Sequence, residues 1–336
     1  MKFSLSIFVI LFALSGYNMV SANNSSGATE EYMNDLDGQR DSGLVRVKDF
    51  GDNPGNLEMY KFIPVPEPKN APLIVVLHGT TQNSHGYACI SEWNKLAQRY
   101  GLILLYPEQR KRNNPYKAFS WFSSSNCQRF RGESGSVMQM IDKMKSDHLI
   151  DSKKVFVTGL SSGGCFTAAL CAVYPDIFAG GAIIAGIPFG AATNPIEGFN
   201  AMLFGVTRDP EEWAKIAKNE YPEYCGKYPK MIVLHGNKDC VVDFGNMREI
   251  MKQFTALHNT DSVPDVTGEL KGHPHNIYKN SSGESVVETI EILNMGHGIA
   301  IDPGDAADQG GNSGAFAISA NLYSSYYFLK LWGLIE

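Results

Sequence analysis

Beyond Leu44, short apolar runs rich in Val and Ile alternate with longer amphipathic stretches, and this alternation leaves the chain few possible folds. The apolar runs predict buried strands and the amphipathic stretches predict helices. The expected strands are residues 73–77, 102–105, 154–158, 181–185, 231–234 and 286–293. The expected helices are residues 87–99, 135–145, 163–173, 246–257 and 315–331. Together they predict an α/β chain with a doubly wound, mostly parallel sheet that carries helices on both faces.

The N-terminal residues predict export. An uncharged apolar run from Phe3 to Leu14 is too short to cross a membrane as a helix, and small residues up to Ala22 suit signal-peptidase cleavage. Residues 1–22 are therefore expected to be a signal peptide, which makes the mature protein secreted. Residues 23–43 are polar and lack periodic apolar positions, so we expect a flexible leader. Residues 44–336 form the expected single domain.

Composition excludes several classes of partner. The chain has 336 residues, of which 43% are hydrophobic and 19% charged, and it is long enough to bury a large core. Its formal net charge is -6, and no run of Lys and Arg could neutralise a row of phosphates, so nucleic acid is not an expected partner. After the N-terminal run no segment is apolar enough to span a bilayer, and we expect no stable membrane insertion.

The sharpest local motif is the run Gly159-Leu160-Ser161-Ser162-Gly163, which lies between an expected strand and an expected helix. In that setting G-x-S-x-G indicates a nucleophile elbow, a strained turn that lifts a serine hydroxyl above the sheet. Glycine is needed on either side because the helix and the strand pass too close for a Cβ atom. The motif and the sheet together predict the α/β-hydrolase fold with Ser161 as the nucleophile.

A serine nucleophile needs a base, and in this fold the triad runs Ser, Asp or Glu, His along the chain. That order removes four histidines: His78, His85, His148 and His235. We select His297 because it follows the expected strand directly and would lie over the carboxyl edge of the sheet. His258 lies at an expected helix end. His273 and His275 lie in a polar insertion with no expected strand leading into it. We expect surface roles for these three, although His273 and His275 could together bind a stray metal ion.

The acid that orients the base should follow the preceding strand, residues 231–234. Asp239 comes after that strand and a short turn, and it is our choice. Asp243 is the alternative, one helical turn further on, and could instead cap a helix.

An oxyanion needs two fixed backbone N–H groups, one from the residue after the nucleophile and one from an earlier loop. Ser162 provides the first. Thr80 provides the second, because it lies in a glycine-containing turn directly after the expected strand at residues 73–77. In the same turn, His78 is expected to support the loop by hydrogen bonding rather than to act in catalysis.

Two long stretches, residues 194–228 and 258–284, interrupt the alternation of strands and helices. Both are expected to follow strands whose carboxyl ends line the active site. They would then form insertions that shape a substrate cleft, or else surface decoration. Trp121 and Phe122 are expected in the core or in a cleft wall.

Six cysteines in an exported chain can form disulfides. The expected pairs are Cys89 with Cys127 and Cys225 with Cys240, and the alternative is that some of these are buried thiols. Cys165 and Cys171 lie on one expected helix, about 9 Å apart along its axis, which is too far for a disulfide. The chain has no His-Glu-x-x-His pair, Cys-x-x-Cys motif or P-loop, so we expect no metal, redox or nucleotide cofactor.

A series of motifs in the same order resembles the secreted polyhydroxybutyrate (PHB) depolymerase-type esterases, a family that includes feruloyl and acetylxylan esterases. The similarity runs from about Phe50 to Pro303. The matching runs are Asn53-Pro54-Gly55-Asn56-Leu57, His78-Gly79, Tyr106-Pro107-Glu108-Gln109, Trp121-Phe122, Arg131-Gly132-Glu133, Val157-Thr158-Gly159-Leu160-Ser161-Ser162-Gly163-Gly164, Ala185-Gly186-Ile187-Pro188-Phe189-Gly190, His235-Gly236 with Asp239, and Gly296-His297-Gly298.

The resemblance implies a serine esterase with Ser161 as nucleophile, Asp239 as acid and His297 as base, and without a cofactor. Two departures occur, because relatives often have cysteines where this chain has Thr80 and Ala118. If those cysteines pair in relatives, that bridge is absent here. The N–H group of Thr80 does not depend on its side chain, so the oxyanion assignment is unaffected.

The expected function is hydrolysis of poly- or oligo(3-hydroxybutyrate)-type esters through an acyl-enzyme, with feruloyl or acetylxylan esters as the alternative. Many relatives carry a linker and a polymer-binding domain after the catalytic domain, whereas this sequence ends at Glu336. We therefore expect soluble esters or oligomers ahead of solid polyester. A peptidase of the same fold is a second hypothesis. It is disfavoured because such enzymes often add a large gating domain, for which this chain has no room. A catalytically inactive secreted binding protein is disfavoured by the complete set of catalytic residue types.

Overall fold

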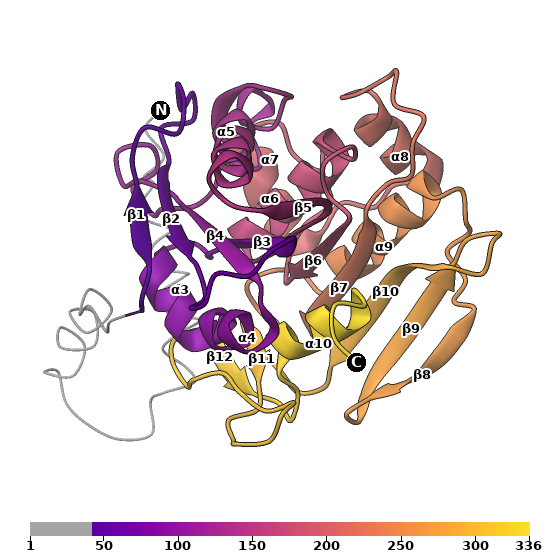
Figure 1. The fold of residues 1–336 in the computed structure, drawn as a ribbon. Helices are drawn as coiled ribbons and strands as arrows, with labels where there is room; N and C mark the ends of the chain where they lie inside the picture. The colour runs from indigo at the N-terminus through magenta and orange to yellow at the C-terminus, as the bar shows by residue number, and fades with distance from the viewer. Residues whose placement is uncertain (1–41) are drawn as a thin grey trace, which may run out of the picture. The chain divides into compact units, whose positions relative to one another are not determined.

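The computed structural model describes residues 42–336, which belong to one compact unit. The signal peptide expected at residues 1–22, and all but the last two residues of the expected leader, lie outside the described residues. Within them, ten strands form one sheet in the order β1-β2-β4-β3-β5-β6-β7-β10-β9-β8 (Figure 1). Their bounds are β1 Val45–Val47, β2 Glu58–Phe62, β3 Ala71–Leu77, β4 Ile103–Glu108, β5 Ile150–Leu160, β6 Gly180–Ile184, β7 Lys230–Gly236, β8 Val266–Leu270, β9 His273–Lys279 and β10 Ser285–Ile292.

The six central strands, from β4 to β10, pair in parallel, and two antiparallel strands extend the sheet at each end. Each of the six expected runs lies within one of these central strands, to within one residue at either end of the run. Parallel strands are buried on both faces, and this is why they appear in the sequence as continuous apolar runs. The predicted α/β-hydrolase type of sheet, mostly parallel with helices on both faces, is confirmed.

The core consists of two layers of side chains, one on each face of the sheet. In β3, Leu73, Val75 and Leu77 pack into one layer. Ile74 and Val76, which alternate with them, pack into the other. The first layer is covered by α5, α6, α8 and α9, and the second by α3, α4 and α10 (Figure 1). The bounds are α3 Ser84–Ser91, α4 Trp93–Tyr100, α5 Gly132–Asp147, α6 Ser162–Val173, α8 Pro210–Lys218, α9 Gly245–Leu257 and α10 Ser324–Leu331.

Two expected helices differ from the structure. The helix expected at residues 87–99 is divided into α3 and α4 at Glu92, whose φ of 48° cannot continue a right-handed helix. The helix expected at residues 315–331 exists only in its second half, α10. Its first half contains β12 (Ala317–Ser319), which pairs in parallel with β11 (Ile299–Ile301). Residues 317–319 form a strand because β11 lies beside them in the fold, and the local sequence pattern does not indicate this pairing.

The two long insertions have different positions. Residues 194–228 follow β6 and contain α7 (Pro195–Phe204) and α8, so this insertion lies at the carboxyl edge of the sheet as expected. Residues 258–284 follow α9 rather than a strand, and that part of the prediction is wrong. They form the β8–β9 hairpin at the edge of the sheet, and His273 and His275 lie within β9.

Neither expected disulfide is formed. Cys127 is buried in the core, and its Sγ lies 3.8 Å and 3.6 Å from the carbonyl oxygens of Ser120 and Trp121. Cys225 and Cys240 are exposed thiols. The spacing of cysteines along a sequence carries no information on the short Cα separations that a disulfide needs. In the part of the chain that the structure describes, no helix is long and apolar enough to cross a membrane.

Candidate active site

The candidate residues gather at the carboxyl edge of the parallel strands. Leu160 of β5 pairs with Ile184 of β6, Ile184 with Leu234 of β7, and Leu234 with Ile290 of β10. Because these residues form one row across the sheet, the loops that follow β5, β7 and β10 begin side by side. Ser161, Asp239 and His297 lie in those three loops.

Ser161 occupies a strained turn between β5 and α6. Its φ of 56° and ψ of -119° lie outside the regions that side chains other than glycine usually adopt. The turn is tight on both sides: a Cβ atom on Gly159 would lie 2.5 Å from the backbone of Gly163, and one on Gly163 would lie 2.5 Å from the carbonyl oxygen of His78. The hydroxyl of Ser161 makes no capping bond to α6, which leaves it available for chemistry.

Two backbone donors lie beside this turn. The first turn of a helix has N–H groups without intrahelical acceptors, and Ser162 is the first residue of α6. Within residues 42–336, neither Ser162 N–H nor Thr80 N–H has a hydrogen-bond acceptor. The turn that contains Thr80 contacts the elbow directly, since a Cβ atom on Gly79 would lie 3.4 Å from the carbonyl oxygen of Leu160.

His78 holds this turn in place, as predicted. Its Nδ1 donates to the carbonyl oxygen of Gly79 at 2.7 Å, and its Nε2 accepts from Gln109 N–H at 3.1 Å. Complete burial lowers the pKa of His78 to about 4, and the charge of Lys117 acts in the same direction. The imidazole is therefore neutral at pH 7, as a group that accepts at one nitrogen and donates at the other must be.

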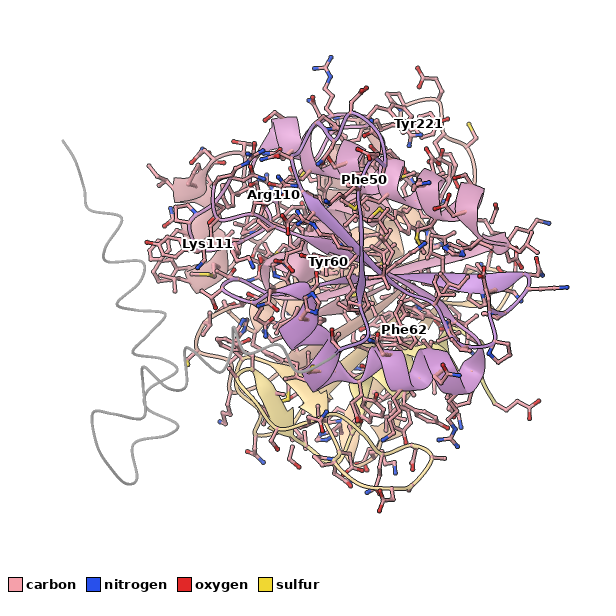
Figure 2. The ribbon with its side chains drawn as sticks, turned by 60° about the vertical axis from the view of Figure 1, so that its left-hand side comes forward. Phe50, Tyr60, Phe62, Arg110, Lys111 and Tyr221 are labelled. Carbon is pink, nitrogen blue, oxygen red and sulfur yellow. The ribbon has the colours of Figure 1, made fainter. Side chains whose placement is uncertain are left out.

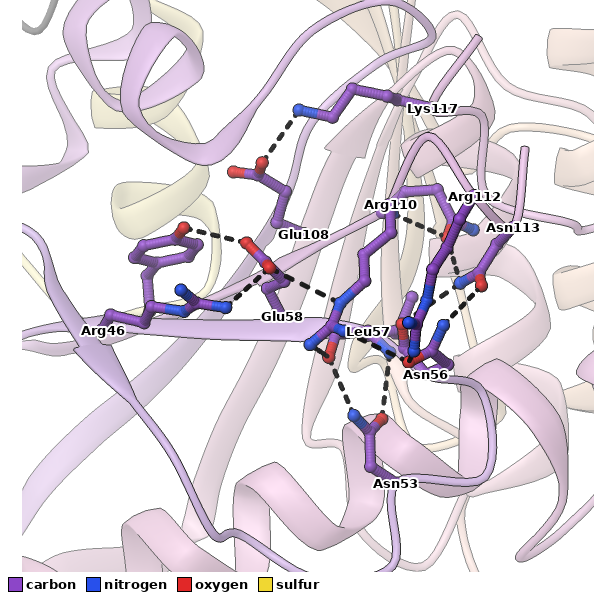
Figure 3. A network of polar contacts seen from close by, with 12 residues as sticks. Arg46, Asn53, Asn56, Leu57, Glu58, Glu108, Arg110, Arg112, Asn113 and Lys117 are labelled. Carbon is purple, nitrogen blue, oxygen red and sulfur yellow. Dashed lines mark hydrogen bonds and ion pairs between the residues drawn. The ribbon is translucent and has the colours of Figure 1, made fainter. Parts of the chain in front are cut away.

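The loop after β4 supports the same turn from outside. Tyr116 in this loop accepts from Thr81 N–H at 2.6 Å. A polar network anchors the loop to the segment before β2 (Figure 3). In this network Arg110 donates to the carbonyl oxygen of Leu57 at 3.3 Å, and Asn113 donates to that of Gly55 at 3.0 Å. Figure 2 shows Arg110 and Lys111 on this side of the molecule together with Tyr60 of β2.

Asp239 and His297 are joined by a 2.7 Å hydrogen bond between Oδ2 and Nδ1. The other carboxylate oxygen, Oδ1, accepts from the N–H groups of Val241 and Val242 at 2.8 and 2.9 Å. Burial by itself would raise the pKa of Asp239, but the facing charge of His297 and the hydrogen bonds from His235 and His297 hold it well below its usual range. Asp239 is therefore ionised and fixed in orientation.

The segment after His297 keeps its ring in position. The chain continues into β11, which pairs with β12, and Phe316 just before β12 packs edge-on against the His297 ring at 6.0 Å. Ile299 N–H donates to the carbonyl oxygen of Phe316 at 2.8 Å. The strand that replaced the first half of an expected helix thus supports the candidate base.

The remaining candidates have other partners. Asp243 lies one residue before the N-cap of α9, Phe244, and its side chain accepts from the N–H of Gly245, the first residue of the helix, at 2.9 Å. His258 donates to Pro229 O at 3.0 Å. His273 is only 7% exposed and bonds Ala320 O at 2.6 Å, whereas His275 bonds Glu288 at 2.7 Å. The surface role expected for His273 is wrong, because β9 carries it against the C-terminal segment. Residues 42–336 contain no group of three metal-ligating side chains.

Chain order excluded His235 as the base, but the structure brings it to the site. It is the penultimate residue of β7 and is fully buried, with Nε2 3.1 Å from Asp239 Oδ2. A histidine four residues before the candidate acid was the available signal. The order of residues along the chain restricts which histidine can be the base. It does not predict whether another histidine also contacts the acid.

The insertion after β6 forms a wall beside these residues. Helix α7 is anchored at the Asp239 loop, because Asp243 N–H donates to the carbonyl oxygen of Met202 at 2.7 Å. On its other side, a Cβ atom on Gly198 would lie 3.1 Å from Phe122. The outer side of α7 exposes two large apolar side chains, Ile196 at 76% and Phe204 at 75%, beside the polar Glu197 and Asn200.

The comparisons with known proteins agree with one another. Residues 60–272 match the sequence model of the family described as Esterase PHB depolymerase. The chain is 43% identical over 292 residues to the Poly(3-hydroxyalkanoate) depolymerase C of Paucimonas lemoignei, covering 87% of this chain and 70% of that protein. It is 33% identical over 272 residues to the Acetylxylan esterase A of Aspergillus ficuum, covering 78% and 88%. The solved acetyl xylan esterase from Aspergillus awamori superposes with a TM-score of 0.73 at 26% identity, covering 87% and 99%.

The fold and these relatives define a carboxylic-ester hydrolase of the α/β-hydrolase class. The ordered motifs and the extent of the match identify a particular family within this class. The chain belongs to the PHB depolymerase esterase family.

Proposed function

We propose that this esterase uses Ser161 as nucleophile, His297 as general base and Asp239 as the acid that orients the base. The observation that carries the proposal is the 2.7 Å bond between Asp239 Oδ2 and His297 Nδ1, at the same sheet edge as the strained Ser161 turn. With Nδ1–H held by the carboxylate, Nε2 of His297 is the nitrogen with a free lone pair. It is therefore the atom that takes the Ser161 proton.

The reaction proceeds through an acyl-enzyme. Ser161 Oγ attacks the ester carbonyl, and its proton passes to His297 Nε2. The tetrahedral oxyanion accepts hydrogen bonds from the N–H groups of Thr80 and Ser162, which have no other acceptor within the described residues. His297 then protonates the leaving alcohol, and the C–O bond breaks. Water, deprotonated by His297, hydrolyses the acyl-enzyme by the reverse route and restores Ser161.

A Ser161→Ala variant tests the nucleophile. We expect kcat for a p-nitrophenyl ester to fall by on the order of 10⁶. A Ser146→Ala change on the outside of α5 is the matched control and should keep wild-type activity. A fluorophosphonate probe should label the wild type and the control but not the Ser161 variant. Wild-type turnover by the Ser161 variant would refute the mechanism, and an unlabelled wild type would instead indicate an inactive binding protein.

For the substrate we propose short oligomers of 3-hydroxyalkanoate esters. The relative named as a poly(3-hydroxyalkanoate) depolymerase supports this class at 43% identity. The exposed side chains of Ile196 and Phe204 on α7, the helix anchored at the Asp239 loop, offer apolar contacts that suit an aliphatic chain. Acetylated xylan is the second candidate, supported by the superposition on the acetyl xylan esterase.

A substrate panel separates the candidates. It compares 3-hydroxybutyrate oligomers, a film of the polymer, acetylated xylan and a feruloyl ester at equal enzyme concentration. We expect the highest kcat/KM on the oligomers. Highest kcat/KM on acetylated xylan or on the feruloyl ester would overturn the substrate assignment and leave the Ser161 mechanism intact.

We further propose that the enzyme is exported after removal of residues 1–22, leaving residues 44–336 as the catalytic domain. The charge and apolar pattern of the first residues support this. N-terminal sequencing of protein secreted by an expressing cell should start at Asn23. Retention of the complete N-terminus in the exported protein would refute the cleavage.

A further inference from the structure

The carboxylate of Asp239 is contacted on all sides. Oδ1 accepts from two backbone N–H groups, and Oδ2 lies between two imidazoles, His297 at 2.7 Å and His235 at 3.1 Å. The ionisable groups that face Asp239 are these two histidines, one from the loop after β10 and one from β7. The proposed mechanism uses the first and assigns no task to the second.

The surroundings of His235 determine its tautomer. Nε2 lies 3.1 Å from Asp239 Oδ2 and 3.2 Å from the carbonyl oxygen of Val242, and both of these atoms only accept. Nε2 must therefore carry a hydrogen. Nδ1 is buried without a partner among the described residues, and the ring packs edge-on against Phe244 at 5.6 Å. A second proton on Nδ1 would have no acceptor, so His235 is a neutral imidazole that donates from Nε2.

The backbone around His235 joins the acid loop to the base loop. A Cβ atom on Gly236 would lie 2.3 Å from the carbonyl oxygen of Met295, two residues before His297. Lys238 N–H donates to the same oxygen at 2.9 Å. The end of β7 thus sets the distance between Asp239 and His297, and the His235 ring fixes the carboxylate from the buried side.

We propose that His235 is a positioning residue for the catalytic acid: its Nε2–H holds Asp239 Oδ2 in line with His297 Nδ1 and withdraws part of the carboxylate charge. The inference rests on the proposed Ser161–His297–Asp239 mechanism. His235 touches neither substrate nor a reacting atom. Loss of its donor has two effects: the carboxylate, still bonded to His297 Nδ1, is less firmly fixed in orientation, which lowers kcat, and it retains more negative charge, which stabilises the imidazolium of His297.

Three substitutions test this contact. In glutamine the amide nitrogen is four bonds from Cα, as Nε2 is in histidine, so His235→Gln keeps a donor at the right reach. In asparagine the amide nitrogen is three bonds away, where Nδ1 was, so His235→Asn is a polar variant that does not reach Asp239. His235→Leu removes the donor altogether.

We expect kcat on a soluble p-nitrophenyl ester to fall about tenfold or more in the Leu and Asn variants, with KM within about twofold of wild type. The acid limb of the kcat/KM profile should move to higher pH in both, because greater charge on Asp239 favours the imidazolium of His297. His235→Gln should restore most of kcat and the wild-type limb. Rates are divided by the number of fluorophosphonate-labelled sites, so that misfolded protein does not count.

Wild-type kcat and an unshifted acid limb in the Asn variant would overturn the role of His235. So would a Gln variant no better than the Asn variant, since both replace the ring by an amide. If the Leu variant does not fold, the comparison of Gln with Asn decides the matter alone. The Ser161→Ala variant separates the two levels: if it stays active, the mechanism itself fails, whereas a change confined to the His235 variants concerns only this contact.

Discussion

His78 gives the structure a pH-dependent stability whose size can be worked out. Burial lowers its pKa from 6.5 to about 4 in the folded protein. Between those two values the unfolded chain binds a proton that the folded protein does not, so stability falls as pH falls. The difference is about 2.5 pH units, and each unit corresponds to about 1.36 kcal/mol. His78 should therefore remove about 3 kcal/mol of stability between pH 7 and pH 4.

A His78→Asn variant isolates this contribution. The amide nitrogen of asparagine occupies the place of Nδ1 and can still donate to Gly79 O, but Gln109 N–H loses its acceptor. At pH 7 the variant should be less stable by about 1–3 kcal/mol, the cost of a buried unpaired donor. Because asparagine does not titrate, the variant should lose about 3 kcal/mol less than wild type on acidification, and the two stability curves should approach each other near pH 4.

The assay is equilibrium urea unfolding at several pH values between 4 and 7.5, followed by tryptophan fluorescence. Groups that do not contact His78 titrate equally in both proteins, so the difference between their curves reports His78 together with Glu108, the carboxylate that interacts with its charge. Phe119→Leu is the control: Phe119 packs against the His78 ring at 5.0 Å, and its substitution should destabilise the protein by a similar amount at every pH. Parallel curves for wild type and His78→Asn would refute a neutral, buried His78.

Three further outcomes follow from the geometry. Gly163→Ala places a Cβ atom 2.5 Å from a backbone carbonyl of the oxyanion turn and should lower kcat by about 10²-fold, whereas Gly268→Ala, with no heavy atom within 4 Å, should leave kcat unchanged; equal effects would contradict the close approach of α6. Asp239→Asn should lower kcat by on the order of 10⁴ at pH 7 because the amide favours the wrong imidazole tautomer, and a variant with wild-type kcat would exclude that role. Cys225 and Cys240 should react with Ellman's reagent in the folded protein and the buried thiols only after unfolding, and a protein without reactive thiols would show that disulfides form after all.

The sequence by itself determined the centre of the molecule. The six parallel strands are largely buried on both faces, so each is rich in apolar residues, and each run was recognisable without a partner even in β10, where Glu288 and Glu291 interrupt it. The elbow around Ser161 was equally readable, because its glycines are imposed by the local contact of a strand with the helix that follows it. The order of the proposed triad along the chain then restricted the candidate acid and base to a few positions.

Only the tertiary structure decided the features that depend on distant partners. The chain around Ala317 has an apolar pattern compatible with a helix and becomes β12 because β11 offers a backbone edge beside it. His273 and His275 lie in a polar stretch that becomes a strand because it pairs with β10. The cysteines remain thiols because folding does not join the expected pairs. The contact of His235 with Asp239 exists because the turn after β7 folds back over the end of its own strand, a return that the spacing of the two residues alone does not specify.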